Sequence, residues 1–196
     1  MYKLTVGICT LPIRIESYYS LMKNLNNQIV VNGFQNTVQL LSIMDCKNMT
    51  VGEKRNLIKK QALGEYLDFI DDDDRISGDY LPSIIEAVGS GADCITFRGE
   101  YKEGEKITDW IITTAGNLVD THTMLYRKPN HISPVRRDIY EKCDFTLKNY
   151  GEDSDYSEQI NKLIKTEFHI PKKLYFYDFD SNNSQTHPKH KIGAYN

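Results

Sequence analysis

The sequence predicts a single α/β domain in which helices flank a mostly parallel sheet. Short β-branched segments alternate with segments of helical periodicity, several strand-like segments end in polar residues, and 196 residues suit one domain with at most a small appendage. Right-handed crossovers place the ends of parallel strands on one edge of a sheet, where open α/β folds bind ligands. We therefore expect the functional residues at the ends of the strands.

Composition limits the class of protein. Hydrophobic residues make up 40%, charged residues 26%, and the net charge is −3, which is typical of a soluble globular protein and does not favour nucleic-acid binding. The four cysteines are scattered, which supports neither a zinc site nor a disulfide framework and favours a reducing cytoplasm. No segment approaches the roughly 20 apolar residues of a membrane span.

The first half reads as alternating strands and helices. Pro12 closes the first strand, Ser17 is a candidate helix cap, and Thr50 with Glu53 forms a predicted capping box. The expected elements are a strand over 3–10, a helix that Ser17 caps, a strand over 38–44, a helix from Thr50 to about Leu63, a strand over 66–70, a helix over 79–88 and a strand over 93–97.

Four consecutive acids, Asp71 to Asp74, follow the strand over 66–70. Such a run at the edge of a sheet suggests a hard divalent cation, because Mg²⁺ or Mn²⁺ beside a nucleotide is held by one or two carboxylates and by phosphate oxygens. A solvated acidic turn is the alternative. An EF-hand calcium loop is excluded, because it needs glycine at its sixth position and glutamate at its twelfth. Counted from Asp71 these positions are Ile76 and Pro82, and counted from Asp73 they are Gly78 and Ile84. An aspartyl-phosphate enzyme of the DxDxT kind is not favoured, because Arg75 or Ile76 stands where that motif has threonine.

Two further strand ends and one helix start are expected to meet this acidic run. Thr10 ends the first strand and Asp45 follows the second, where an acid can contact a nucleoside or simply form a turn. Lys54 and Arg55 lie in the first turn of a helix, where basic residues are disfavoured, so an anionic partner is expected. A diphosphate, the aspartates or an ordinary salt bridge would each meet this expectation.

The second half has a different character. Residues 99–114 read as polar and turn-rich, and Trp110 either packs or stacks on a sugar. A strand over 118–126, a helix starting at 134–137, an acid-rich helix start at 150–156 and a strand over 174–177 follow. The acids at 150–156 either cap the helix or supply a general base. The polar tail over 180–196 is a candidate lid.

These segments carry a resemblance to a known family. Residues 52–56 fit G-x-x-R-N, and residues 62–74 fit A-x-G-E-Y-hydrophobic-x-F-hydrophobic-D-x-D-D. Together they closely resemble GT-A (Rossmann-like) glycosyltransferases. Tyr126-Arg127, 134–137 and 151–153 are similar to acceptor-side motifs of the inverting, family-two-like members. The likeness spans about 3–164 and suggests a compact single-domain form of bacterial or viral and phage type.

The resemblance implies roles for individual residues. Asp71 and Asp73 would form the DxD pair that binds Mn²⁺ or Mg²⁺, with His187 a candidate third ligand, and Asp153 would be the catalytic base. The donor would contact Thr10, Asp45, Arg55, Asp71 and Asp72. The resemblance also implies a donor-binding half over 1–97, an acceptor half over 98–179 and a tail over 180–196. The loop at 9–14 departs from the family's Pro-Thr-Tyr-Asn-Arg-like form.

The implied function is metal-dependent, inverting transfer of a sugar from a UDP- or GDP-sugar to a hydroxyl of a glycan or other acceptor, in the cytoplasm, which would be that of a host cell if the gene is viral. Three alternatives remain. A nucleotidyltransferase would usually carry a Gly-rich phosphate loop that the segment 10–14 lacks. The others are a non-catalytic nucleotide-sugar-binding module and an enzyme whose acceptor is a DNA base.

Overall fold

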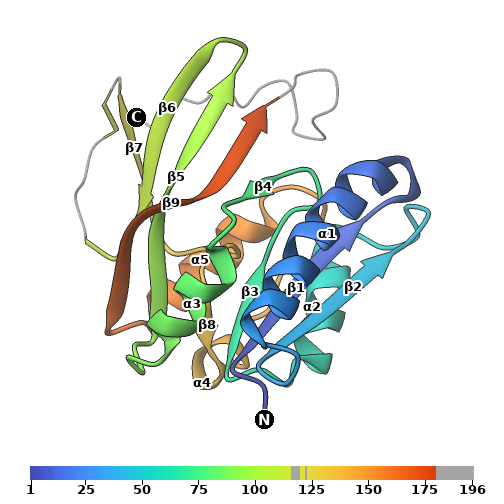
Figure 1. Ribbon diagram of the computed structural model, residues 1–196, viewed down its shortest axis with the longest axis horizontal. Helices are drawn as coiled ribbons and strands as arrows, with labels where there is room; N and C mark the ends of the chain where they lie inside the picture. The colour runs from blue at the N-terminus through green and yellow to red at the C-terminus, as the bar shows by residue number, and fades with distance from the viewer. Residues whose placement is uncertain (116–119, 122, 180–196) are drawn as a thin grey trace.

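The computed structural model describes residues 1–115, 120–121 and 123–179. Strands and helices alternate through the first half of the chain, and strands dominate the second half (Figure 1). The elements are β1 Leu4–Thr10, η1 Pro12–Arg14, α1 Ile15–Asn32, β2 Val38–Met44, α2 Val51–Gln61, β3 Tyr66–Phe69, β4 Arg75–Ile76, α3 Tyr80–Val88, β5 Cys94–Glu103, β6 Lys106–Ile112, β7 Met124–Arg127, β8 Val135–Arg136, α4 Arg137–Tyr140, α5 Glu152–Asn161 and β9 Glu167–Phe179.

Within the described residues the strands form one nine-stranded sheet. Its main path runs β2-β1-β3-β8-β5-β6-β7, and β9 pairs with both β5 and β4. The strands β2, β1 and β3 are parallel, as are β5 with β9 and β6 with β7, and these ladders hold most of the paired residues. The short strand β8 and the β5–β6 hairpin add antiparallel pairs. The predicted α/β class, a mostly parallel sheet flanked by helices, is confirmed.

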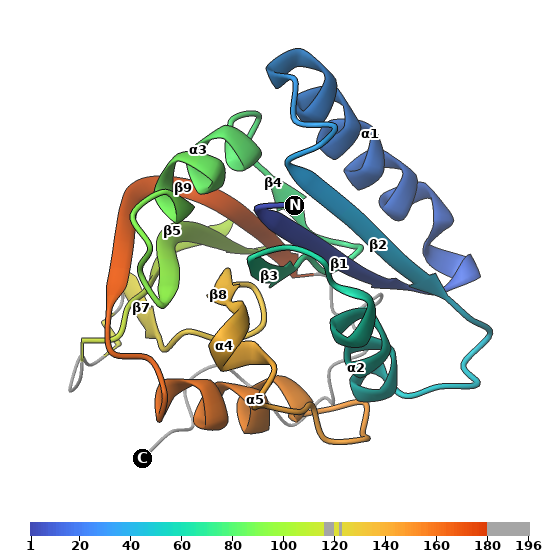
Figure 2. The same ribbon diagram turned by 90° about the horizontal axis from the view of Figure 1, so that it is seen from below.

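The helices cover both faces of this sheet (Figure 2). One apolar cluster packs α1 and α3 against β1 and includes Tyr66, and the other packs α2, α4 and α5 and includes Leu67 and Phe69. Side chains of β3 therefore alternate between the two cores, and all four of its residues are buried. Full burial of one aromatic side chain contributes roughly 2–3 kcal/mol. Because β3 is anchored on both faces, the acids that follow it start from a fixed point.

Several predicted elements are confirmed with small changes at their ends. The strands at 3–10, 38–44 and 66–70 are β1, β2 and β3, and the capping box of α2 is present, with Thr50 accepting from the Glu53 amide and Glu53 accepting from the Thr50 amide. The cap assigned to Ser17 is wrong. The α1 helix begins at Ile15, because the 3-10 turn that Pro12 opens runs directly into it, and no side chain caps it.

The second half corrects four predictions, the first of which concerns residues 99–114. Residues 99–114 are not turn-rich but form most of the β5–β6 hairpin, which turns at Gly104 with a φ of 61°. Gly99 lets Trp110 pack on β5, since a Cβ there would lie 2.0 Å from the indole Cζ2. Trp110 is buried beside Phe97 and Tyr175, which confirms the packing interpretation.

The remaining corrections concern element lengths. The sequence predicts a strand over 118–126. Among the described residues of this range, the strand that is present is β7, which begins at Met124. The helix predicted from Pro134 is preceded by the two-residue strand β8, and α4 itself has four residues. The last strand is longer than predicted, because β9 already begins at Glu167 and pairs along the whole of β5. Among the described helices none is long and apolar enough to cross a bilayer.

Candidate active site

The acidic loop, Asp71 to Asp74, follows β3, and one residue of β9 forms hydrogen bonds with both of its ends. The hydroxyl of Tyr175 donates to Asp74 Oδ2 at 2.6 Å, and it accepts from the backbone amide of Asp71 at 3.2 Å. Burial and the neighbouring Asp71 raise the pKa of the Asp74 carboxyl well above its usual value. Asp74 is therefore an internal hydrogen-bonding group of the loop rather than a solvent-facing ligand.

Asp71 is held from two sides. Arg55 Nη2 donates to its Oδ1 at 2.8 Å, and His131 Nε2 lies 3.1 Å from its Oδ2. Although burial acts to raise it, the nearby His131 and Arg55 hold the pKa of the Asp71 carboxyl well below its usual range. Both carboxylate oxygens are thus engaged by protein groups, while the side chain remains 38% exposed.

Arg55 joins the acidic loop to α5. Its guanidinium lies 5.7 Å from the centre of the Phe69 ring and 5.4 Å from that of Phe145, and its Nη1 donates to Glu152 Oε1 at 2.7 Å. The side chain is 4% exposed. Because a buried guanidinium needs anionic partners, its two carboxylates hold the loop and the first turn of α5 together.

Asp72 and Asp73 share a different cation. Arg14 Nη1, from the 3-10 turn after β1, lies 2.7 Å from Asp72 Oδ1 and 3.0 Å from Asp73 Oδ2. Asp72 is 2% exposed and its Oδ2 has no partner among the described residues, whereas Asp73 is 39% exposed. Burial, together with the charges of Asp71 and Asp72, raises the pKa of Asp73 to about 6 although Arg14 opposes the shift.

The ends of β1 and β2 meet at Lys54, as the sequence predicts. Its Nζ donates to the Thr10 carbonyl at 3.2 Å and to Asp45 Oδ1 at 2.7 Å, and the other oxygen of Asp45 accepts from the amides of 48–49. The hydrogen bond from Lys54 lowers the pKa of Asp45. The anionic partners expected for Lys54 and Arg55 are therefore carboxylates at the strand ends.

The first turn of α5 carries three acids in different surroundings. Glu152 is 7% exposed and bound to Arg55, and burial raises its pKa. Asp155 accepts from Thr146 at 2.7 Å and pairs with Lys148 at 2.6 Å. In the described part of the chain, no hydrogen bond or ion pair engages the side chain of Asp153, which is partly exposed. Of the three, Asp153 is the carboxylate left available to another molecule.

Several residues of this site were not predicted. His131 and Tyr175 contact Asp71 and Asp74, and Glu152 contacts Arg55; all three are far from their partners in sequence, and only packing brings them together. The sequence carried a signal for Glu152, within the acid-rich helix start at 150–156, and for Arg14, as a basic residue in the loop after the first strand. His187 lies outside the described residues, so its predicted metal role remains a prediction.

The carboxylates fit a divalent cation of the kind that a nucleotide completes. No group of three metal-ligating side chains occurs among the described residues, so a cage built by protein alone is not available. Mg²⁺ and Mn²⁺ beside phosphates need only one or two carboxylates. Asp73 is half-exposed and Asp72 has one carboxylate oxygen without a partner among the described residues, so these two side chains could serve as such ligands. Asp71, the other predicted ligand, already binds Arg55 and His131.

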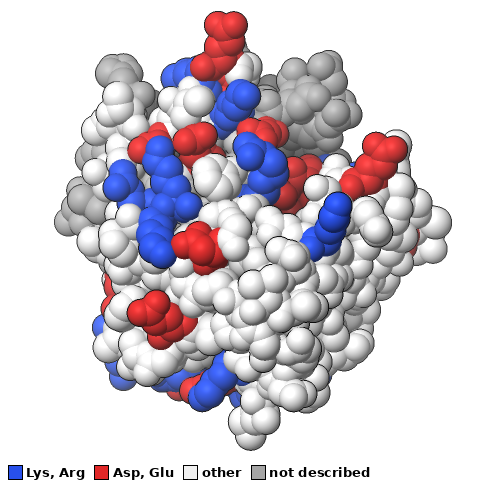
Figure 3. All heavy atoms as spheres, in the orientation of Figure 1, with Lys and Arg blue, Asp and Glu red and all other residues white. Residues whose placement is uncertain are grey.

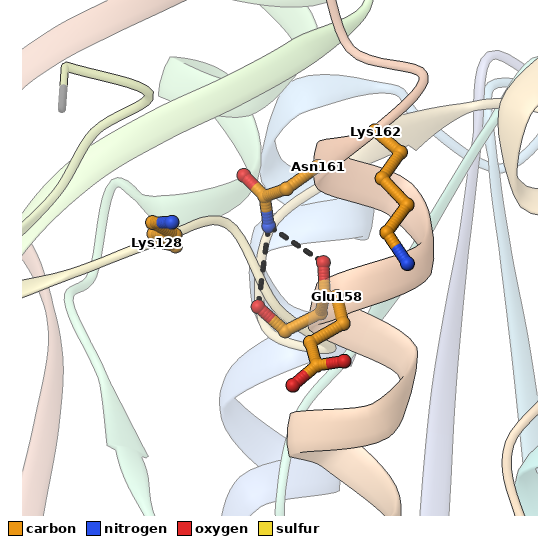
Figure 4. Close-up of a pocket in the computed structure, with 5 residues that line it drawn as sticks. Lys128, Glu158, Asn161 and Lys162 are labelled. Atoms are coloured by element: carbon orange, nitrogen blue, oxygen red, sulfur yellow. Dashed lines mark hydrogen bonds between the residues drawn. The ribbon is translucent and has the colours of Figure 1, made fainter.

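A separate hollow of about 280 Å³ lies farther along α5 (Figure 4). Lys128, Ser157, Glu158, Asn161 and Lys162 line it. Asn161 Nδ2 donates to the carbonyl and to the hydroxyl of Ser157, at 2.7 and 3.2 Å. None of these lining residues belongs to the acidic loop or its partners, so the chemistry is expected at the strand ends and not in this hollow.

No protein-family model and no curated protein matches the sequence. Solved structures of S. aureus TarS are similar in fold. TarS 1–349 has a TM-score of 0.64 at 16% identity, covering 90% of this chain and 60% of that one. Its complex with UDP-GlcNAc has a TM-score of 0.65 at 14% identity, covering 91% and 59%. Its complex with UDP has a TM-score of 0.63 at 14% identity, covering 90% and 60%.

This chain therefore spans about three fifths of the length of TarS 1–349. At such identity the likeness shows a shared fold alone.

Proposed function

We propose that this chain is a metal-dependent glycosyltransferase that moves a sugar from a nucleoside-diphosphate sugar to an acceptor hydroxyl with inversion. The observation that carries the proposal is the meeting of the strand-end acids, Arg14, Lys54 and the first turn of α5 at one edge of the sheet. The fold, shared with a protein solved in complex with UDP-GlcNAc and UDP, supports a nucleotide-sugar donor.

The donor would lie at the ends of β1, β2 and β3, beside Thr10, Asp45 and the acidic loop. The carboxylates of Asp72 and Asp73 would hold Mg²⁺ or Mn²⁺, which would supply charge stabilisation to the departing diphosphate. Arg55 and His131 keep Asp71 ionised and fixed in place.

Asp153 is the proposed general base. It takes the proton from the acceptor hydroxyl as that oxygen attacks the anomeric carbon and the bond to the diphosphate breaks. A single displacement from the opposite face inverts the anomeric configuration. Asp153 suits this role better than its neighbours because Glu152 and Asp155 are already paired with basic side chains.

The charge distribution argues against a DNA acceptor. On the face shown in Figure 3, acidic and basic side chains are intermixed rather than sorted into a basic patch. Lys173 of β9, for example, pairs with Glu100 and Asp109 of the neighbouring strands, at 3.3 and 2.5 Å. Because DNA binding relies on cations that are available to phosphates, we propose a glycan or another hydroxyl-bearing acceptor.

A panel of UDP- and GDP-sugars, read by release of nucleoside diphosphate with and without EDTA, tests the proposal. We expect one donor class to react and EDTA to stop the reaction. With the best donor, Asp153→Asn should lower the transfer rate by about 10²–10⁴ and leave UDP or GDP binding unchanged.

Asp155→Asn is the matched control, since it removes an acid from the same helical turn. We expect nearly normal rates from it. Nearly normal transfer by Asp153→Asn would disprove the base assignment, and a protein that binds the donor without releasing diphosphate would be a binding module instead.

A further inference from the structure

One nitrogen atom lies between two carboxylates of the acidic loop. Arg14 Nη1 is 2.7 Å from Asp72 Oδ1 and 3.0 Å from Asp73 Oδ2, so both acids converge on a single positively charged donor. The usual pairing of a guanidinium with one carboxylate uses two nitrogens and both oxygens. Here a single nitrogen lies between two carboxylates. This is the position that a metal cation bridging Asp72 and Asp73 would occupy.

The other cations near the loop have different partners. In the described part of the chain, Arg14 is the one cationic side chain that forms an ion pair with Asp72 or Asp73. Lys54 pairs with Asp45, Arg55 with Asp71 and Glu152, and Arg75 with Asp178. The charge of Asp72 and Asp73 is thus balanced by one side chain.

Arg14 is also held by few contacts besides those with Asp72 and Asp73. It ends the three-residue turn η1, its side chain is 21% exposed, and no second hydrogen-bonding partner besides the acidic loop holds its guanidinium among the described residues. Arg55 contrasts with it, because its side chain is 4% exposed and its guanidinium packs against two aromatic rings. Arg14 can therefore exchange partners at little cost to the core.

We propose that Arg14 is an internal counter-ion that occupies the cation position between Asp72 and Asp73 until the donor arrives, and then transfers to the donor's diphosphate. This rests on the proposed function. It assigns Arg14 the control of when the divalent cation binds.

The physical argument concerns competition for the same oxygens. Without a nucleotide, a divalent cation must displace Arg14, lose water and accept few protein ligands in return. With a nucleotide present, the diphosphate supplies further oxygens to the cation, and the displaced guanidinium gains a phosphate partner, which it binds well. Donor and cation therefore bind cooperatively, and by linkage each increases the affinity for the other by the same factor.

Mn²⁺ binding, measured as loss of the free-ion EPR signal with and without UDP, tests this role. In Arg14→Gln, we expect Mn²⁺ alone to bind roughly fivefold tighter, because its competitor is gone, whereas UDP in the presence of Mn²⁺ binds roughly tenfold weaker. The factor by which UDP increases Mn²⁺ affinity should fall accordingly. The two affinities change in opposite directions, which simple damage to the loop would not produce.

Two further variants serve as controls. Arg14→Lys keeps the counter-ion but not the fork of donors, so Mn²⁺ alone should bind as in the unaltered protein while UDP binds less tightly. Arg75→Gln removes the same charge from β4, directly after Asp74 in the chain, from a side chain that pairs with Asp178 and not with Asp72 or Asp73, and both affinities should stay within about twofold.

Other results would overturn the assignment. If Arg14→Gln leaves Mn²⁺ affinity without UDP unchanged or lower, Arg14 only supports the loop, and the proposed function still stands. If Arg14→Lys without UDP binds Mn²⁺ roughly fivefold tighter than the unaltered protein does, the cation does not compete with the positive charge at position 14, and the assignment is wrong. If the unaltered protein binds no Mn²⁺ with either UDP or GDP, the metal-dependent function and this inference both fail.

Discussion

Asp68 and Asp93 are both buried, yet their carboxyl groups have opposite pKa shifts. Burial raises the pKa of Asp68 well above its usual value, since only the Tyr80 hydroxyl and one amide oppose it and its Oδ1 has no partner in the described chain. Burial acts on Asp93 as well, but the amides of 165–166, at 2.7 and 3.0 Å, and Arg136 lower its pKa. The number of donors around a carboxylate, not burial alone, decides the sign.

Asp68→Asn is expected to stabilise the protein at alkaline pH. The folded state keeps a proton on Asp68 that the unfolded chain releases above about pH 4. Folding then takes up a proton, and stability falls as pH rises by up to about 1.4 kcal/mol per pH unit. Asparagine does not need to take up a proton on folding. The substitution should therefore raise the free energy of unfolding more at pH 8 than at pH 5, as measured by urea unfolding at both pH values.

Asp93→Asn is the contrasting substitution. The folded pKa of Asp93 is lowered, so its contribution is present above the unfolded pKa and is lost as pH falls through the folded one. The variant should lose about 1–3 kcal/mol at pH 7 and less in acid. Equal destabilisation by both substitutions at pH 8 would mean that Asp68 is ionised in the folded protein.

At the scale of elements, α2 shows how a local signal and a tertiary contact act together. Its start is fixed by the capping box of Thr50 and Glu53, which needs neighbouring residues alone. Gly52, in the same turn, lies against the segment before α5, where an added Cβ would be 1.9 Å from the Thr146 carbonyl oxygen. The glycine lets the helix that carries Lys54 and Arg55 approach that segment closely.

Gly52→Ala should therefore destabilise the protein, by about 1–3 kcal/mol, because the backbone of 146–148 has to shift. Gly78→Ala is the matched control. Nothing lies within 4 Å of a Cβ at Gly78 and its φ is not in the left-handed region, so alanine there should be neutral or slightly stabilising. Urea unfolding of both variants measures the difference, and equal values would show that α2 has room for a Cβ.

At the scale of the molecule, one sheet with two cores joins the first and second halves of the chain. The short strand β8 pairs with both β3 and β5, and β9 returns to pair with β4. Each core also draws side chains from both halves, as with Leu67 and Tyr156. The donor half predicted over 1–97 and the acceptor half predicted over 98–179 therefore share one sheet and both cores.

Unfolding is accordingly expected to be a single transition. Trp110, in β6, is the one tryptophan and reports on the second half, whereas far-UV circular dichroism also reports the helices of the first. The urea midpoints of the two signals should coincide. A lower midpoint for the fluorescence of Trp110 would show that the β5–β6–β9 region unfolds independently.

The sequence by itself determined the alternating first half, the capping box of α2 and the meeting of Thr10, Asp45 and the acidic loop at one edge. These follow from periodicity, from hydrogen bonds between near neighbours and from the handedness of crossovers, all of which depend on local pattern. The sequence did not predict the β5–β6 hairpin. A strand with polar side chains on one face resembles a loop when the strand that pairs with it is unknown.

Only the tertiary structure decided which partner each acid has. Asp71 contacts Arg55 and His131, Asp74 contacts Tyr175, and Asp72 and Asp73 contact Arg14, across sequence separations that reach 101 residues. Four adjacent aspartates are alike in sequence and differ in burial, charge and availability once folded. The physical reason is that ion pairs depend on where side chains lie in space, and packing of the two cores fixes those positions.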